Sequence, residues 1–207
     1  MNRVLLFYTL VLPLSFVPWL IPASFWGHVL IVLMSYLLVP LILSLTLGFR
    51  PNEVGLKLPN REGLKLFFVL FVISIPLSLY GTKIPSMRNY YPVFSYSGPL
   101  TFLLGELGMG LLMLAHEAFY RGFLLFPLAR RNEWVAIILQ DIPYTLVHMG
   151  KPGVEIPYAF IAGVIFAKMD LKGKSFLPSF LLHWLGSAFF DLLCVLSKSG
   201  LLRLAVP

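Results

Sequence analysis

The chain has 207 residues, of which 58% are hydrophobic and only 12% are charged. Soluble domains carry about 25% charged residues, so this composition excludes a water-soluble enzyme and indicates a helical membrane protein. The net charge of +7 is typical of Lys and Arg that anchor loops beside anionic lipid, and we interpret it that way rather than as a nucleic-acid-binding surface. The single cysteine, Cys194, excludes an intrachain disulfide framework and a cysteine-rich metal motif.

Apolar segments long enough to cross a bilayer follow one another along the chain. A transmembrane helix needs roughly 20 mostly apolar residues to cross about 30 Å of hydrocarbon. The first segment is long for the apolar part of a signal peptide and a second follows almost at once, so we predict that it is retained. The sequence therefore predicts an all-α polytopic transmembrane helical bundle of about seven spans. In chain order these are 4–21, 25–47, 64–80, 100–128, 134–148, 156–169 and 176–196.

Three of the predicted spans have unusual lengths. The fourth is too long for one straight crossing, so we expect it either to extend beyond the bilayer or to break near Gly105, Gly108 and Gly110. The fifth and sixth are short, so we expect them to be tilted, partly shielded by neighbouring helices, or not to cross completely.

The basic residues of the loops predict the orientation. With the N-terminus inside, the inner loops hold ten Lys and Arg and the outer loops hold five. We therefore predict a multi-pass integral membrane protein, in the plasma membrane, with a cytoplasmic N-terminus. No repeat or low-complexity linker divides the chain, so 1–207 is predicted to be one membrane domain. Its N-terminal helices and a loop occupy 1–97, and its chemistry lies in 98–197.

Polar side chains within the predicted spans are few, and nearly all of them lie in the C-terminal half. Such residues are costly in lipid and usually face the interior of a bundle. Each of three spans offers one polar stripe, and packing the stripes together allows carboxylate, guanidinium and imidazole groups to satisfy one another. We therefore predict one intramembrane site. Its candidates are Glu106, His116, Glu117, Arg121, Gln140, Asp141, Tyr144, His148, His183, Ser187 and Asp191.

The spacing of these residues leaves a structural alternative open. Glu117 and Arg121 are four residues apart and so share one helix face, as do His183 and Ser187. The first pair is also explained as a buried ion pair that holds the bundle together. Each histidine is likewise explained as an interhelical hydrogen-bonding residue. Three intramembrane histidines together with a glutamate and an arginine nevertheless favour a functional site.

Several common catalytic motifs are incomplete or missing. His116 and Glu117 begin like the zincin motif H-E-x-x-H, but Tyr120 stands where the second histidine is required. No serine stands beside a base in a nucleophile motif, no glycine-rich phosphate loop is present, and no pair of aspartates suggests an aspartyl protease.

Three short runs resemble the motifs of one known family. Residues 115–122, A-H-E-A-F-Y-R-G, resemble E-E-x-x-x-R-G; residues 144–148, Y-T-L-V-H, resemble F-x-x-x-H; and residues 183–187, H-W-L-G-S, resemble H-x-x-x-N. In order and spacing they are similar to the CAAX-protease and bacteriocin-processing family of intramembrane glutamic-type endopeptidases. The resemblance implies that 98–197 forms a catalytic core of helices around a cavity open to the cytosol.

The resemblance also implies roles for individual residues. Glu117 is expected to pair with Arg121, and His148 is expected to help hold the attacking water. His183 and Ser187 are expected to face the oxyanion that forms on the scissile carbonyl. A base for water and donors for the oxyanion are what peptide hydrolysis requires.

The family's first motif glutamate is replaced here by His116, and three interpretations follow. In the first, His116 or Glu117 acts as the base of an altered peptidase. In the second, His116, His148 and His183 hold a divalent metal, because three histidines and a water form a common catalytic zinc site. In the third, the protein is a non-catalytic peptide-binding or bacteriocin-immunity protein.

The first interpretation gives the predicted function. It is hydrolysis of a peptide bond in a membrane-associated protein or in a lipidated or leader peptide, within the lipid bilayer and without a cofactor. One geometric requirement accompanies it. Seven simple crossings place His148 near the outer end of its span and Glu117 nearer the inner half, so the two meet only if the fifth helix is tilted or displaced.

Overall fold

The computed structural model describes residues 2–202, which form helices and contain no strand. The α-helices are α1 (Arg3–Val11), α2 (Val17–Leu20), α3 (Phe25–Val32), α4 (Val39–Thr46), α5 (Arg61–Gly81), α6 (Pro85–Tyr90), α7 (Pro99–Glu117), α8 (Phe126–Ala129), α9 (Glu133–Leu146), α10 (Glu155–Gly173) and α11 (Leu177–Lys198). Short 3₁₀-helices lie at η1 (Leu12–Phe16) and η3 (Pro51–Val54), and π-helices at η2 (Leu33–Leu38) and η4 (Ala118–Leu125).

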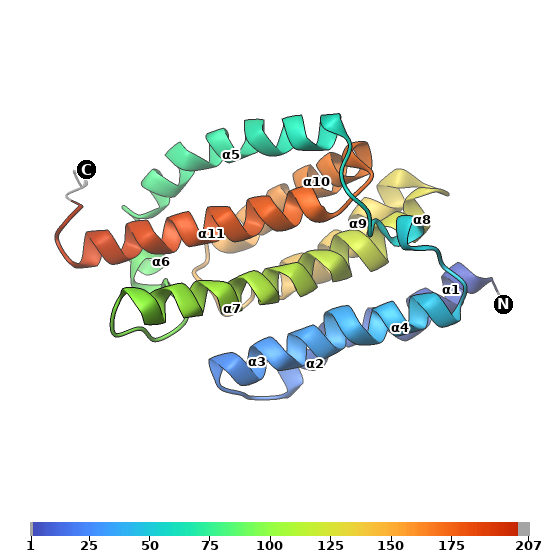
Figure 1. Cartoon of the computed structure of the whole chain (residues 1–207), viewed down its shortest axis with the longest axis horizontal. Helices are drawn as coiled ribbons and strands as arrows, with labels where there is room; N and C mark the ends of the chain where they lie inside the picture. The colour runs from blue at the N-terminus through green and yellow to red at the C-terminus, as the bar shows by residue number, and fades with distance from the viewer. Residues whose placement is uncertain (1, 203–207) are drawn as a thin grey trace.

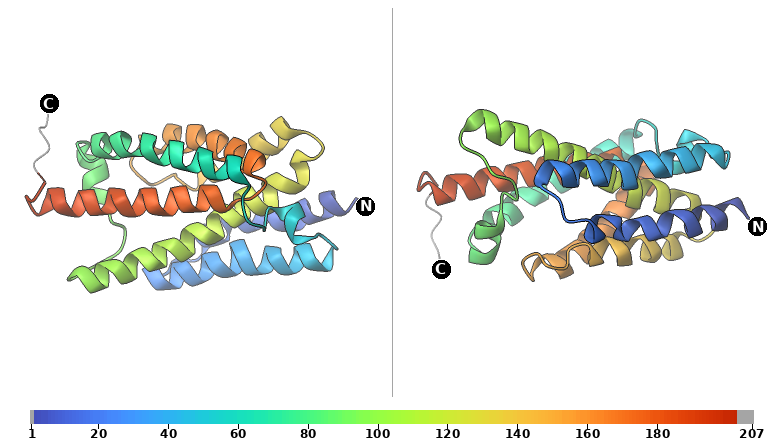
Figure 2. Two further views of the ribbon diagram at one scale, coloured as in Figure 1. Left: turned by 45° about the horizontal axis from the view of Figure 1, so that its top comes forward. Right: turned by 90° about the horizontal axis from the view of Figure 1, so that it is seen from below.

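The predicted helical membrane bundle is confirmed. Five helical rods in residues 2–202 are long and apolar enough to cross a membrane, and they are Arg3–Leu20, Phe25–Thr46, Arg61–Gly81, Pro99–Ala129 and Leu177–Lys198. The rods run along one common direction, and the start of α1 and the end of α11 lie at opposite ends of the bundle (Figures 1 and 2). The chain is therefore an integral membrane protein.

The fifth and sixth predicted spans are helices of a different kind. Helix α9 has only 14 residues, too few to cross the hydrocarbon by itself. Helix α10 has 19 residues, but Glu155, Lys168, Asp170 and Lys172 make it more charged than the five rods. Both helices pack against each other and against the rods, so neighbouring protein supports these polar segments.

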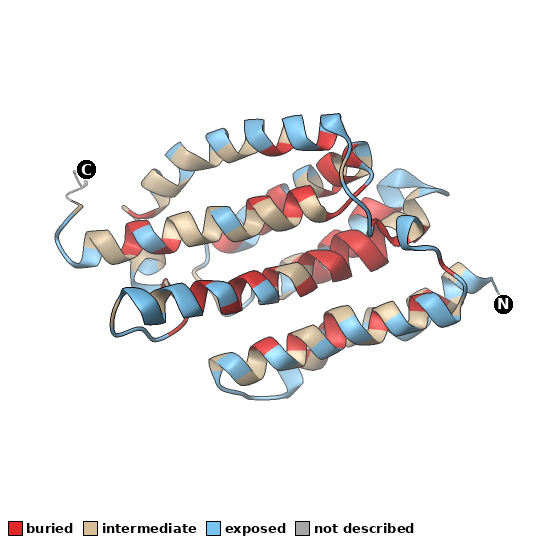
Figure 3. Ribbon diagram, viewed as in Figure 1, coloured by how far each residue is buried: buried red, intermediate tan, exposed pale blue. Residues whose placement is uncertain are grey.

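The five rods present apolar side chains outward. In Arg61–Gly81 only 11% of the most apolar stretch is buried inside the protein, and Phe68 and Val72 are each more than 60% exposed. Such a surface fits lipid rather than water. Buried residues concentrate instead in the second half of α7 and in η4 (Figure 3). This distribution places the core around the fourth rod.

The fourth rod does not break at its glycines. It continues from Pro99 to Ala129, and each glycine is covered by an aromatic ring instead. A Cβ added to Gly105 would meet Phe94, and one added to Gly110 would meet Trp184 at 2.6 Å. The glycines therefore allow the loop before α7 and the face of α11 to approach closely, which is a usual function of small residues between membrane helices.

A second close approach joins α5 to α10. Asn60 caps α5 through a 2.9 Å hydrogen bond from the Gly63 backbone N–H, and its Nδ2 donates to the carbonyl of Lys172 at 2.8 Å. At this crossing a Cβ added to Gly63 would lie 2.7 Å from the Cα of Gly173. Because the obstacle is backbone, the two helices must separate to admit any side chain.

Gly63→Ala is therefore expected to destabilise the protein by about 1–3 kcal/mol, as overpacking does. The gain in helix propensity offsets up to about 1 kcal/mol of this loss. Thermal unfolding in mild detergent measures the change. Gly186→Ala is the matched control, because an added Cβ there meets nothing within 4 Å. Equal melting temperatures for the two variants would contradict the close crossing.

Candidate functional site

Glu117 stands at the junction of three helices and is completely buried. Its Oε1 accepts a 2.6 Å hydrogen bond from Nδ1 of His183 on α11. Its Oε2 lies 3.2 Å from Nε of Arg121, one turn further along the fourth rod. Both carboxylate oxygens therefore face a cationic or hydrogen-bonding partner, and the Glu117–Arg121 pair expected from the spacing is formed.

Arg121 is also completely buried, and aromatic rings surround it. Its guanidinium carbon lies 3.8 Å from the centre of the Tyr144 ring on α9 and 5.7 Å from that of Phe166 on α10. The negative faces of the rings attract the cation, most strongly where water is excluded. The sequence marked Tyr144 as part of a motif, but nothing in it pointed to Phe166 as the second ring.

The rod changes from α-helix to π-helix immediately after Glu117. The π segment η4 carries Arg121 and has eight buried residues in succession. π-helical turns are rare and are often found at functional sites. A second π segment, η2, lies beside it, and the ring of Tyr36 in η2 stacks on Phe119 at 4.3 Å. The π-helical segment η4 thus coincides with the part of the rod that packs around the polar centre.

His148 reaches this centre because α9 is short. Helix α9 ends at Leu146, and His148 follows in a turn inside the protein, only 6% exposed. Its Nδ1 lies 2.9 Å from the carbonyl oxygen of Tyr144, and its ring is 5.0 Å from the ring of the same tyrosine. Tyr144 also contacts Arg121, so this tyrosine links His148 to the Glu117–Arg121 pair.

His183 completes the arrangement from α11. Its ring lies 6.4 Å from that of Tyr144, so the imidazoles of His148 and His183 both contact this tyrosine. Ser187 lies one turn further along α11 and is half-buried. Among residues 2–202 Ser187 forms no hydrogen bond to the Glu117 centre. The structure thus brings together Glu117, Arg121, His148 and His183.

The beginning of α11 is held by residues that the sequence did not single out. Ser179 donates to Asp170 of α10 through its hydroxyl at 2.5 Å and through its backbone N–H at 3.1 Å. Both residues are fully buried. Ser179 lies one turn before His183, so this contact fixes α11 in the position that delivers the imidazole to Glu117. The only sequence signal was an aspartate directly beyond the sixth predicted span.

His116 lies beside the centre in an aromatic cage. Its ring stacks on Tyr36 at 5.4 Å and lies 5.1 Å from Tyr120 and 6.0 Å from Tyr144. Its Nδ1 is buried without a hydrogen-bond partner in the described chain. The hydroxyl of Tyr120 donates to that of Tyr36, which donates to the carbonyl of Ser15. His116 therefore packs against the second predicted span, in which the sequence showed almost no polar residue.

The candidate metal ligands do not form a metal site. Within residues 2–202 no three His, Cys, Asp or Glu side chains are close enough together to hold a metal ion. His116 faces Tyr36, Nδ1 of His183 is bonded to Glu117, and Nδ1 of His148 faces a backbone carbonyl. The donor set of the metal interpretation is therefore not assembled.

The other acids within the predicted spans form no ion pair with Arg121 in residues 2–202, where its ion-pair partner is Glu117. The side-chain oxygens of Glu106 and Asp191 are buried and have no hydrogen-bond partner in residues 2–202. The backbone carbonyl of Glu106 accepts from Nε1 of Trp184 at 2.9 Å. Asp141 lies against Gly163, where an added Cβ would be 1.7 Å from its Oδ1. Glu106 and Asp191 thus lie close to each other, whereas Asp141 lies near enough to Arg121 for their charges to interact.

Comparison with known proteins agrees with this geometry. Residues 98–189 match the family described as Type II CAAX prenyl endopeptidase Rce1-like. No curated protein and no solved structure is similar enough to the chain to count as a match. The matched region runs from α7 into α11 and contains the residues of the polar centre. The match supports the family predicted from the three motifs: residues 98–189 of this chain are similar to the Type II CAAX prenyl endopeptidase Rce1-like family.

Proposed function

We propose that this chain is an intramembrane endopeptidase in which an imidazole, oriented by Glu117, activates the attacking water. The observation that supports this best is the 2.6 Å contact between Glu117 Oε1 and His183 Nδ1. An ionised carboxylate only accepts hydrogen bonds, so the proton of a neutral His183 ring lies on Nδ1. Its Nε2 is then left with a lone pair, which is the form of imidazole that takes a proton from water.

The same reasoning applies to His148. A backbone carbonyl only accepts, so the contact with Tyr144 places the proton of a neutral His148 ring on Nδ1 as well. Its Nε2 is thereby available to accept a hydrogen bond from water. The two rings contact one tyrosine and are suited to hold one water between them. Of these two histidines, only His183 has a carboxylate partner in residues 2–202, so we assign the base to His183 and water holding to His148.

Glu117 acts as a positioning residue in this proposal. Its two oxygens are engaged by His183 and Arg121, and it is completely buried, so it does not reach substrate. Arg121 supplies the positive charge that keeps Glu117 ionised in this low-dielectric environment. His116 is assigned a packing role, because its ring is stacked on Tyr36.

The proposed reaction follows from these assignments. His183 Nε2 removes a proton from water while the water oxygen forms a bond to the scissile carbonyl carbon. The carbonyl oxygen becomes an oxyanion, towards which the Ser187 hydroxyl donates. His183 then gives its proton to the leaving nitrogen as the carbon–nitrogen bond breaks. The products are a carboxylic acid and an amine, which exchange one proton to become a carboxylate and an ammonium group, and the enzyme is returned to its initial state.

The substrates proposed are membrane-associated proteins and lipidated or leader peptides, because the centre lies among membrane-spanning rods. We place the protein in the plasma membrane with its N-terminus in the cytoplasm. The excess of basic residues in the loops at that end supports this orientation.

His148→Ala is expected to abolish processing in cells. Quantitative mass spectrometry of membrane-protein termini would compare cells that produce the wild-type chain, His148→Ala and His28→Ala at equal levels. His28→Ala is the matched control, because His28 lies in α3 outside the polar centre. New termini are expected with wild type and His28→Ala and not with His148→Ala. Identical termini with all three proteins and with no protein would instead support the non-catalytic peptide-binding role.

A further inference from the structure

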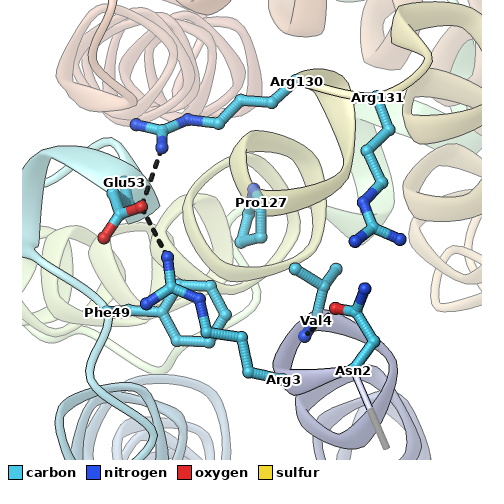
Figure 4. A pocket seen from close by; sticks show the side chains of 8 residues that line it. All are labelled: Asn2, Arg3, Val4, Phe49, Glu53, Pro127, Arg130 and Arg131. Carbon is cyan, nitrogen blue, oxygen red and sulfur yellow. Dashed lines mark hydrogen bonds and ion pairs between the residues drawn. The ribbon is translucent and has the colours of Figure 1, made fainter.

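A basic cavity lies at the end of the bundle where α1 begins, away from the Glu117 centre. Its volume is about 190 Å³, and a second cavity of about 370 Å³ shares Arg3, Glu53 and Arg130 with it. We call the two together the arginine pocket. Its side chains come from the start of α1, from η3 and from the turn after α8 (Figure 4). These three segments are far apart in the sequence.

Glu53 holds the pocket together. Its Oε1 accepts hydrogen bonds from Arg3 at 2.9 Å and from Arg130 at 2.7 Å, and its Oε2 accepts the Arg50 backbone N–H at 2.8 Å. That backbone hydrogen bond, together with the positive charges of Arg3 and Arg130, holds the pKa of Glu53 below its ordinary 4.5. Glu53 is therefore ionised at neutral pH and fixes the two arginines in convergent positions.

The pocket keeps an excess of positive charge after Glu53 is satisfied. Arg3, Arg50, Arg130 and Arg131 line it against one carboxylate, which leaves a formal charge of +3. Arg131 lies across the cavity from Glu53, and its guanidinium points into the space (Figure 4). Within residues 2–202 the Arg131 side chain has no ion-pair partner. Convergent guanidinium groups with one unengaged member form a strong site for an oxyanion.

The start of α1 adds to the positive electrostatic potential of the arginine pocket. The Asn2 side chain caps this helix by accepting the Val4 backbone N–H at 3.1 Å, and both residues line the cavity. The N-terminus of a helix carries a partial positive charge and favours anions. Because α1 also begins the first rod that is long and apolar enough to cross a membrane, we expect the pocket to lie at the level of lipid head groups.

We propose that the arginine pocket binds a phosphate group, presented by the head group of an anionic phospholipid. A tetrahedral phosphate offers oxygens in several directions, which suits guanidinium groups that approach from different sides. The bound phosphate would join α1, η3 and the turn between α8 and α9. Pro127 lines the same cavity at the start of α8, directly after the π segment that carries Arg121. Lipid binding would therefore stiffen the end of the rod that holds the candidate catalytic centre.

The test uses the full-length protein in an uncharged detergent. Thermal unfolding is followed during titration with dihexanoyl phosphatidic acid, dihexanoyl phosphatidylcholine or inorganic phosphate. A ligand that binds only the folded state raises the melting temperature in a concentration-dependent manner. We expect phosphatidic acid to stabilise wild type and Arg131→Gln to raise its apparent Kd roughly tenfold, because one charge-assisted contact is lost.

Arg61→Gln is the matched control. It removes the same charge from an exposed residue at the start of α5 that does not line the pocket. The apparent Kd of this variant is expected to stay within about twofold of wild type. Stabilisation by phosphatidic acid well beyond that by inorganic phosphate supports the lipid source. Equal stabilisation by the two at equal concentration shows that the pocket takes free phosphate and overturns the lipid assignment. No stabilisation by either, or equal weakening by Arg131→Gln and Arg61→Gln, overturns the site itself.

Discussion

His183→Ala is expected to lower kcat for peptide-bond hydrolysis by roughly 10²–10⁴-fold, the usual contribution of a positioned general base. Glu117 holds the proton of the neutral His183 ring on Nδ1, which leaves a lone pair on Nε2. The alanine variant lacks this lone pair and so cannot accept the proton of water. KM is expected to change little, because proton removal from water occurs only on the way to the transition state. The substrate for this assay is a membrane peptide whose cleavage is found by the comparison of termini.

Two controls separate chemistry from folding in this experiment. The melting temperature of His183→Ala in detergent reports whether α11 stays in place, since the Ser179–Asp170 contact remains. Ser187→Ala removes only one donor from the same helix, so a smaller fall in kcat, on the order of 10²-fold, is expected. An unchanged kcat with a raised KM would show that His183 binds substrate and does not activate water.

Glu117→Gln is expected to produce the largest loss of stability, about 3–5 kcal/mol. Removal of one member of a buried ion pair leaves the other charge buried and uncompensated. Here Arg121 would lose its ion pair with Glu117 and would retain the rings of Tyr144 and Phe166 and the longer-range attraction of Asp141 and Asp170. Thermal or denaturant unfolding in mild detergent measures this loss.

A double variant distinguishes this mechanism from a general defect of packing. Glu117→Gln combined with Arg121→Met removes both charges, so we expect it to be more stable than Glu117→Gln alone. Its activity should stay low, because the carboxylate that orients His183 is missing in both. Glu53→Gln is the control for the substitution itself, and its partly exposed ion pairs are expected to contribute about 0–1 kcal/mol each. If the double variant is no more stable than Glu117→Gln, the uncompensated charge of Arg121 is not the cause of the lost stability.

The sequence by itself determined the class of fold and the family that residues 98–189 resemble. Long apolar runs allow only helices that satisfy their own backbone hydrogen bonds in lipid, so composition and length predicted seven spans, and five of these are rods long and apolar enough to cross a membrane. Polar residues inside such runs are costly, so Glu117, Arg121, His148 and His183 stood out without any coordinates. Spacing along a single helix also predicted the Glu117–Arg121 pair, because this contact is local.

Only the tertiary structure decided how these residues are used, because their contacts depend on helices that are distant in the sequence. The bond between Glu117 and His183 requires α7 to lie against α11, and the position of His148 requires α9 to stop at Leu146. The packing of His116 against Tyr36 joins two rods whose sequences do not indicate that they touch.

The arginine pocket depends on the tertiary structure in the same way. Arg3, Glu53 and Arg130 look like ordinary loop charges in the sequence, and only the folded chain makes them converge. Hydrophobicity is a property of each segment and can be seen in the sequence. The partner of a buried or convergent polar group is set by the packing of whole helices.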